Sequence, residues 1–231
     1  ACSMKLNTTG HSNTSVGTCA LYTNTEGDTN TAVGHHALKL NTTAADNTGI
    51  GRNALCTTTT GCVNTAMGSS AMQLNTTGDS NVAIGGSTLF NNTTADNNTA
   101  IGTTAMVDNT TGANNTAVGY AALANNTTAG GNTAIGTNSL ITNTTGDGLV
   151  AIGANSMYAN TSGSNNVTVG HSSLESNTTG HSTTAVGRSA LASQTTGEDN
   201  VAVGYKALVT ATTSCGNVAV GICSLHNHTT G

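Results

Sequence analysis

A glycine recurs every seventeen residues along this chain without a single slip in the spacing. The series comprises Gly17, Gly34, Gly51, Gly68, Gly85, Gly102, Gly119, Gly136, Gly153, Gly170, Gly187, Gly204 and Gly221. So regular a period predicts one short structural unit copied about thirteen times, with neighbouring copies stacked on one another. No copy carries an insertion, and enzymes commonly place their chemistry on such loops, so we predict a protein that is not an enzyme.

The composition excludes several kinds of partner. Charged residues make up 6% of the chain, aromatic residues 2% and hydrophobic residues 35%, and proline is absent, which fits neither disorder nor collagen. The net charge is -5 with only five Lys and Arg, so no basic patch is expected to bind nucleic acid. No apolar run approaches the length of a membrane span, so we expect no membrane insertion and no signal peptide within this sequence.

Aligning the copies shows which positions are restricted to large aliphatic residues. One such position precedes the glycine and another follows it by four residues. We predict that both face a dry interior and that Thr31 points inward, Ala32 outward and Val33 inward, with the period of a β-strand. The predicted core ladder comprises Val33, Ile50, Met67 and Ile84 together with Leu38, Leu55, Met72 and Leu89.

These columns predict an all-β fold. Seventeen residues cannot hold a pair of helices with their turns, and the β-branched residues favour strands. We therefore predict a single-chain parallel β-solenoid, or β-roll, of 17-residue coils, about 13 to 14 in number, stacked at roughly 4.8 Å. Residues 1–231 form one such domain in this interpretation. It could be a segment of a longer chain, because it opens at Ala1 and ends within a unit at Gly231.

A threonine column accepts no substitution, and we predict that it points inward and bonds a turn carbonyl. It includes Thr8, Thr25, Thr42, Thr59, Thr76 and Thr93. The preceding Asn and the following Thr9-type residue are then expected to face outward. Candidate N-glycosylation sites on that outward edge are Asn7, Asn41, Asn75, Asn92, Asn109, Asn126, Asn143, Asn160 and Asn177. The alternative for these residues is a bare Asn ladder that stabilises stacked strands.

An alanine column beside the glycines suggests a smooth outward stripe. Its members include Ala32, Ala66, Ala83, Ala100, Ala117 and Ala134. We predict that this stripe lets copies approach one another closely in a trimer or fibril. The alternative is a tight turn that excludes larger side chains.

Six cysteines could form three local disulfides. The candidates are Cys2 with Cys19, Cys56 with Cys62, and Cys215 with Cys223. Cys2 and Cys19 are one period apart, and two of the pairs lie near the ends, where they would act as staples in an oxidising compartment. No Cys-x-x-Cys motif occurs, so metal binding is the weaker alternative.

No catalytic set or cofactor site is apparent. His226 and His228 are a weak metal candidate, and the remaining histidines are expected on the surface. Acidic residues recur in one turn column, at Asp28, Asp79 and Asp147, but too seldom for a calcium-binding repeat. We therefore predict no metal, no catalytic residue and no cofactor.

The strand sequences Asn30-Thr31-Ala32-Val33-Gly34 and Asn98-Thr99-Ala100-Ile101-Gly102 resemble the head repeats of trimeric autotransporter adhesins. Similar units occur in phage-tail-fibre-like and bacterial surface proteins. The resemblance implies a left-handed parallel β-roll, often packed as a parallel trimer and displayed outside the cell. The coil is longer than is usual in that family, and the sequence contains no heptad run of the kind that forms the coiled-coil stalk of those adhesins.

Three functions are considered. The first is an extracellular structural or adhesive fibre element on a cell or virion surface, assembling with copies of itself, with glycans or a host surface as further partners. The second is an ice-binding solenoid that uses outward ranks of Asn7-type and Thr9-type residues. The third is a glycan-binding solenoid, although Tyr22, Phe90, Tyr120, Tyr158 and Tyr205 form no continuous aromatic column.

Overall fold

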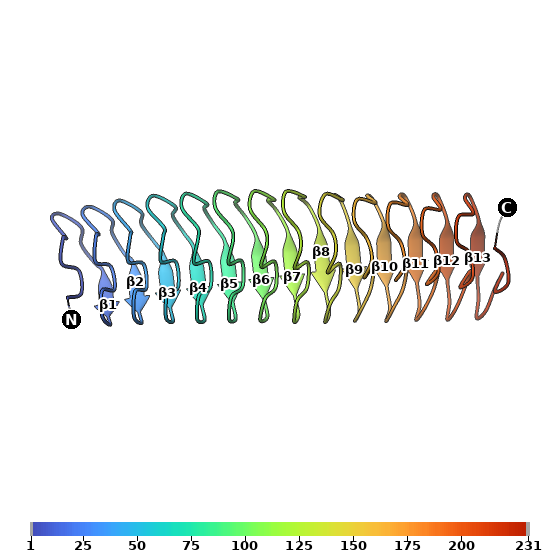
Figure 1. Ribbon diagram of the computed structural model, residues 1–231, viewed down its shortest axis with the longest axis horizontal. Coiled ribbons are helices and arrows are strands. Elements are labelled where there is room, and N and C mark those ends of the chain that lie inside the picture. Colours follow the sequence, from blue (N-terminus) through green and yellow to red (C-terminus); the bar gives the residue numbers. More distant parts are fainter. Residues whose placement is uncertain (1, 230–231) are drawn as a thin grey trace. The chain divides into compact units, whose positions relative to one another are not determined.

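A computed structural model describes residues 2–229 and contains strands and turns, with no helix in that range. Each coil contributes one three-residue strand followed by tight turns (Figure 1). The strands are β1 (Thr14–Val16), β2 (Thr31–Val33), β3 (Thr48–Ile50), β4 (Thr65–Met67), β5 (Val82–Ile84), β6 (Thr99–Ile101), β7 (Thr116–Val118), β8 (Thr133–Ile135), β9 (Val150–Ile152), β10 (Val167–Val169), β11 (Thr184–Val186), β12 (Val201–Val203) and β13 (Val218–Val220). The prediction of an all-β parallel solenoid with a 17-residue coil is confirmed.

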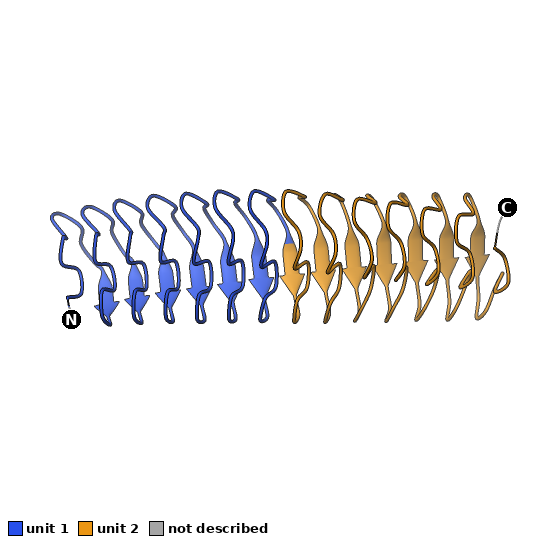
Figure 2. Cartoon of the chain, in the orientation of Figure 1, with its two compact units in different colours: residues 1–115 blue, residues 116–231 orange. Residues whose placement is uncertain are grey.

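The chain divides into two compact units, Ala1–Asn115 and Thr116–Gly231 (Figure 2). Strands β1–β6 belong to the first unit and β7–β13 to the second. Within each unit, successive strands pair in parallel and in register, so that Thr14 lies opposite Thr31. Residues one period apart therefore stack in columns. Each column is named by its member in the coil 24–40, such as the Leu38 column.

The Leu38 column supplies one large apolar side chain per coil, and the coil of β9 buries a second, Leu149. From Leu21 to Leu208 the members of the Leu38 column, including Leu55, Met72 and Leu89, have no exposed surface, as predicted. Every described member of this column has a left-handed backbone, with φ 49° at Leu38. That conformation costs a non-glycine residue about 1–2 kcal/mol. Full burial of a Leu or Met, worth about 1.5–3 kcal/mol, offsets this cost.

The direction predicted for the strand residues is wrong. The Ala32 column points inward, and Ala32, Ala66, Ala83, Ala100, Ala117 and Ala134 are fully buried. The Val33 column points outward, and the exposed fraction of Met67 is 41% and that of Ile84 is 37%. Val33 and Ile50 are half-buried. The predicted core ladder is thus correct for its Leu38 half only, and the alanines cannot form an outward stripe.

The space inside the strand explains why alanine occupies the inward column. Gly49 takes the place of alanine in β3, and a Cβ built there would lie 3.3 Å from the Ala54 carbonyl oxygen and 3.4 Å from Cγ of Leu38. A methyl group therefore already fills the gap between the strand and the buried Leu38 column. A larger aliphatic residue would overpack this interior.

The invariant glycine column is explained by two independent constraints. Its members have positive φ, for example 140° at Gly34, a conformation that L-residues rarely adopt. A Cβ on Gly34 would also lie 2.4 Å from the carbonyl oxygen of Gly51 in the next coil. The close approach of neighbouring backbones therefore requires glycine at this corner, except at Gly221, where no atom lies within 4 Å of the Cβ position and only the positive φ favours glycine.

Within the described chain, no helix suitable for spanning a membrane is found.

Candidate interaction surface

The invariant threonine column concentrates hydrogen bonds on one carbonyl per coil. The carbonyl oxygen of Thr25 accepts backbone N–H groups of Thr8, Thr9 and Gly10, at 3.0, 3.0 and 3.2 Å. The Thr8 hydroxyl donates to the same oxygen at 2.8 Å. Equivalent hydroxyl bonds recur at Thr42, Thr59, Thr76 and Thr93. The predicted turn bond is thus present, but the threonines are half-buried or exposed at the turn, outside the core.

The Asn24 column lies inside the coil and forms an amide ladder. Nδ2 of Asn41 donates to Oδ1 of Asn24 at 2.6 Å and to the Ala44 carbonyl at 3.0 Å. The predicted glycan acceptors Asn41, Asn75, Asn92, Asn109, Asn126, Asn143, Asn160 and Asn177 are fully buried, and Asn7 is half-buried. The outward orientation predicted for them is therefore wrong. A buried, bonded amide leaves no room for a glycan in the folded coil, and the expected ice-facing Asn rank is not on the surface.

One substitution interrupts this ladder in the first unit. Thr58 occupies the Asn24 column, where its shorter side chain reaches no neighbouring amide. Both Oδ1 of Asn41 and Oγ1 of Thr58 are buried without a hydrogen-bond partner. An unsatisfied buried polar group costs about 1–3 kcal/mol, so this coil is a local weak point.

A second interior ladder, the Asn30 column, was missed in the sequence analysis. Oδ1 of Asn13 accepts the backbone N–H of Asn30 at 2.8 Å, and Nδ2 of Asn13 donates to the Gly27 carbonyl at 2.7 Å. Asn30 repeats this pattern toward Asn47 and Ala44. Because an Asn precedes almost every strand in the sequence, this ladder could have been predicted.

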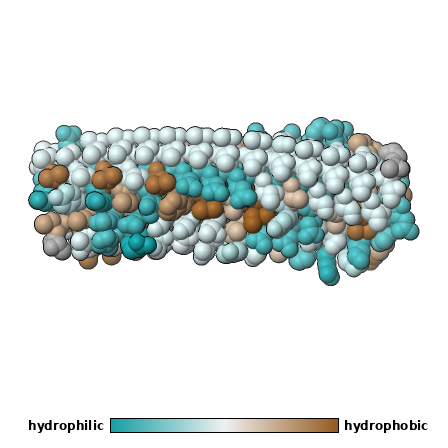
Figure 3. All heavy atoms as spheres, viewed as in Figure 1, coloured by the Kyte–Doolittle hydropathy of each residue, from teal (hydrophilic) through white to brown (hydrophobic). Residues whose placement is uncertain are grey.

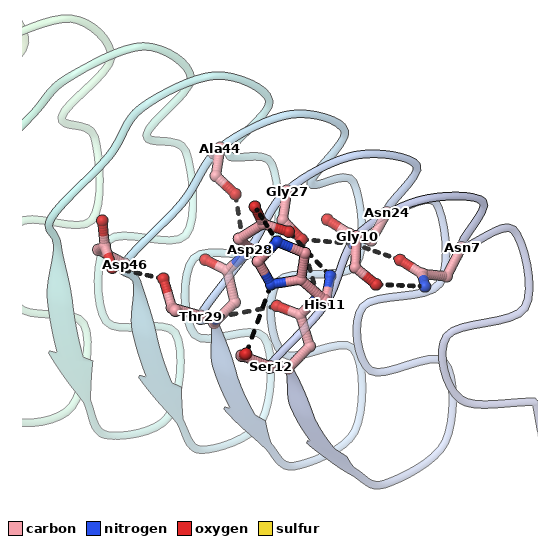
Figure 4. A network of polar contacts seen from close by, with 12 residues as sticks. Asn7, Gly10, His11, Ser12, Asn24, Gly27, Asp28, Thr29, Ala44 and Asp46 are labelled. Carbon is pink, nitrogen blue, oxygen red and sulfur yellow. Dashed lines mark hydrogen bonds and ion pairs between the residues drawn. The ribbon is translucent and has the colours of Figure 1, made fainter.

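Side chains of the Asp28 column link the turns of successive coils (Figure 4). Oδ1 of Asp28 accepts the backbone N–H of His11 at 2.8 Å, and the second carboxylate oxygen lies 3.2 Å from Nε2 of His11. Asp79 likewise accepts the N–H of Cys62, at 2.6 Å. In the second unit, Nε2 of His181 lies 2.8 Å from Oε1 of Glu198. These carboxylates hold coils together, which accounts for the acidic column without a metal ion.

All six cysteines are free thiols, so the predicted bridges Cys2–Cys19, Cys56–Cys62 and Cys215–Cys223 do not form in the structure. Sγ of Cys62 and Sγ of Cys215 each accept a backbone N–H at 3.4 Å, where other coils use an Asp28-type carboxylate. Their proposed partners, Cys56 and Cys223, belong to other columns. Burial raises the pKa of the Cys56 thiol, and the nearby Lys39 charge opposes this shift.

The outward face of the strands displays two uncharged ranks. The Thr31 column contains only Thr and Val, and the Val33 column only Val, Ile and Met. In the Val33 column the exposed fraction lies between 36% and 41% at Met67, Ile84, Ile101, Ile135, Ile152 and Val169. The face drawn in Figure 3 carries its hydrophobic side chains in separate patches. The continuous aliphatic rank of the strands is therefore the most regular apolar feature of each unit, named here the strand face.

The described residues contain no detected pocket and no group of three or more His, Cys, Asp or Glu that could hold a metal ion. Comparison of the chain with models of known families, with curated proteins and with solved structures gives no significant match. The resemblance to adhesin head repeats therefore stays a prediction.

Proposed function

We propose that the chain is a non-enzymatic structural element of a fibre displayed outside the cell or on a virion, and that it assembles with copies of itself. The observation that carries this proposal is the strand face, an unbroken aliphatic rank in every coil of each unit. Soluble proteins rarely expose a long contiguous apolar surface without a partner. The extracellular location and an adhesive role rest on the resemblance to surface-protein repeats.

A second copy is well suited to cover the strand face. Two copies share the same 17-residue period and the same strand spacing, so their ranks can pack in register along a unit. Val, Ile and Thr side chains are short and branched, which limits the side-chain entropy lost on contact. The tightly bonded interior leaves the coil stiff enough to present this surface preformed.

The test is sedimentation equilibrium over a range of protein concentrations. The expected result is a particle heavier than the 22.7 kDa of one chain at micromolar concentration. Ile101→Asp combined with Ile152→Asp should reduce the mass while leaving the circular dichroism spectrum unchanged. Asn125→Asp combined with Ser176→Asp, in the turn column of Asp108 midway between successive strands, is the matched control. A wild-type monomer at high concentration would contradict the proposal.

Ice binding is the second candidate function, but the outward Asn rank predicted to contact ice is buried. The buried Asn ladder removes one of the two ranks on which that prediction relied. The strand face offers Thr next to aliphatic residues instead. A thermal-hysteresis measurement on the same samples would reveal such an activity, and a clear positive result would favour this candidate over self-assembly.

A further inference from the structure

Charged residues are sorted to opposite sides of the strands. All five Lys and Arg residues lie in the part of the coil that follows the strand, named the basic edge: Lys5, Lys39, Arg52, Arg188 and Lys206. All acidic residues except Asp108 and Glu175 lie in the turn that precedes the strand, named the acidic edge: Glu26, Asp28, Asp46, Asp79, Asp96, Asp147, Glu198 and Asp199. The uncharged strand face lies between the two edges.

The coil of β3 shows how the edges join the strand face. Alternate residues Asp46, Thr48, Ile50 and Arg52 occupy the outward positions on either side of the buried Asn47 and Gly49. Asp46 and Arg52 are exposed. One continuous outward strip therefore begins with a carboxylate, crosses two uncharged side chains and ends with a guanidinium group.

The basic edge lacks carboxylate partners within its own chain. Across residues 2–229 the ion pairs are those of His11 with Asp28 and His181 with Glu198, and neither involves Lys or Arg. Nζ of Lys5 and Nζ of Lys206 instead lie 5.7 and 5.4 Å from the centres of tyrosine rings. These cations are free to pair with carboxylates of another molecule.

We propose that copies associate in parallel through the strand face, with the acidic edge of one copy against the basic edge of the next. This inference rests on the proposed function and specifies its geometry. When two such faces meet with their stacking axes in the same direction, the strands of the two copies run in opposite directions, and unlike edges coincide. When the axes run in opposite directions, like edges coincide, and their repulsion disfavours the complex.

The charges also select the stagger between copies. Two coils carry a carboxylate just before the strand and a Lys or Arg just after it: that of β3 with Asp46 and Arg52, and that of β12 with Asp199 and Lys206. A parallel partner without stagger pairs unlike charges at both coils. After a shift by one coil, Arg52 of one copy faces the uncharged turn before β4 and Arg52 of the other faces Asp28, so fewer unlike pairs remain. Zero stagger is therefore the expected register within each unit.

The experiment reverses charges in β3 and β12 and measures association by sedimentation. Asp46→Lys with Asp199→Lys gives a copy with two positive edges, and Arg52→Glu with Lys206→Glu gives a copy with two negative edges. Each variant alone should associate about tenfold more weakly than wild type, because like charges then face each other. The two variants mixed should recover wild-type affinity as a heterodimer. The chain that carries all four changes should recover it alone.

Two further measurements separate this inference from the proposed function. A spin label on Ser12, introduced through an unnatural amino acid, should report a label-to-label distance no greater than the width of the interface, since parallel unstaggered copies hold equivalent residues at the same level on its two opposite edges. A long distance would overturn the parallel arrangement. Association that is indifferent to all charge reversals would overturn the edge pairing and leave self-assembly standing, whereas a monomeric wild type would remove both proposals.

Discussion

The glycine column offers the sharpest test of the fold, because two adjacent glycines in one coil differ in their constraints. Gly85 has φ 137°, and a Cβ there would lie 2.7 Å from the Gly102 carbonyl carbon and 2.7 Å from Oγ1 of Thr88. Gly86 has no atom within 4 Å of its Cβ position and no left-handed φ. The substitution Gly85→Ala should therefore destabilise the chain strongly, and Gly86→Ala should not.

The magnitude follows from two terms. A backbone with φ 137°, which is nearly exclusive to glycine, costs an alanine about 1–3 kcal/mol, and the forced contact with the neighbouring coil adds about 1–3 kcal/mol, so Gly85→Ala should lose roughly 2–6 kcal/mol. Gly86→Ala should gain about 0.4–1 kcal/mol by restricting the unfolded chain.

Urea denaturation followed by circular dichroism measures this difference. Stacked repeats can lose two-state behaviour, so hydrogen exchange at the Gly102 amide, which donates to the Ile84 carbonyl at 2.8 Å, supplies a local readout. Faster exchange at Gly102 is expected for Gly85→Ala only. Equal midpoints for the two variants would show that the close backbone approach between coils is not the reason for the glycine period.

Three further predictions concern the interior and the turns. Thr58→Asn should complete the amide ladder by donating to Asn41, which raises the free energy of unfolding by about 1–3 kcal/mol in urea titrations. Ala100→Val should overpack the strand interior and cost about 1–3 kcal/mol, whereas Ile101→Val on the outward face should stay within about 0.5 kcal/mol. Burial and neighbouring cations lower the pKa of His36 from 6.5. The unfolded chain then takes up this proton first, so stability should fall as the pH drops below about 6.5, and His36→Asn should reduce that slope in pH-dependent melting.

Each of these three predictions would be contradicted by a specific result. An unchanged or lower midpoint for Thr58→Asn would mean that the ladder does not contribute to stability. A greater loss of stability for Ile101→Val than for Ala100→Val would indicate that Ile101, and not Ala100, points into the interior. A pH slope identical in wild type and His36→Asn would show that this imidazole does not couple to folding. Asparagine is already present at the equivalent Asn53, so backbone strain is matched in that comparison.

The repeat period predicted the fold because every copy must satisfy the same neighbours. The Leu38 column was placed correctly because a large aliphatic residue at a fixed spacing has few alternatives to burial. The strand was predicted with the correct period and the opposite phase. Alternation does not say which side of a strand is inward. The larger side chain of Val33 was expected to be the buried one, but Leu38 already fills the interior space that Ala32 faces.

The polar interior was harder to predict. Asn24 and Thr25 lie in a turn, where the alternation of a strand does not apply, so outward asparagines did not follow from an inward threonine. Asn is usually exposed, but in this solenoid the Asn24 amide donates to Asn7 in the preceding coil and to Gly27 in its own coil, and accepts from Asn41 in the following coil. Hydrogen bonds between stacked copies therefore decide which polar residues are buried.

In-register pairing also bears on how such a chain changes length. Each coil meets its neighbours through the same contacts, so gaining or losing whole 17-residue segments within a unit joins surfaces that already fit. An insertion of any other length would move every later side chain to the wrong column. A gene encoding such coils can therefore lengthen or shorten its product by duplication and deletion, with little need for compensating changes elsewhere.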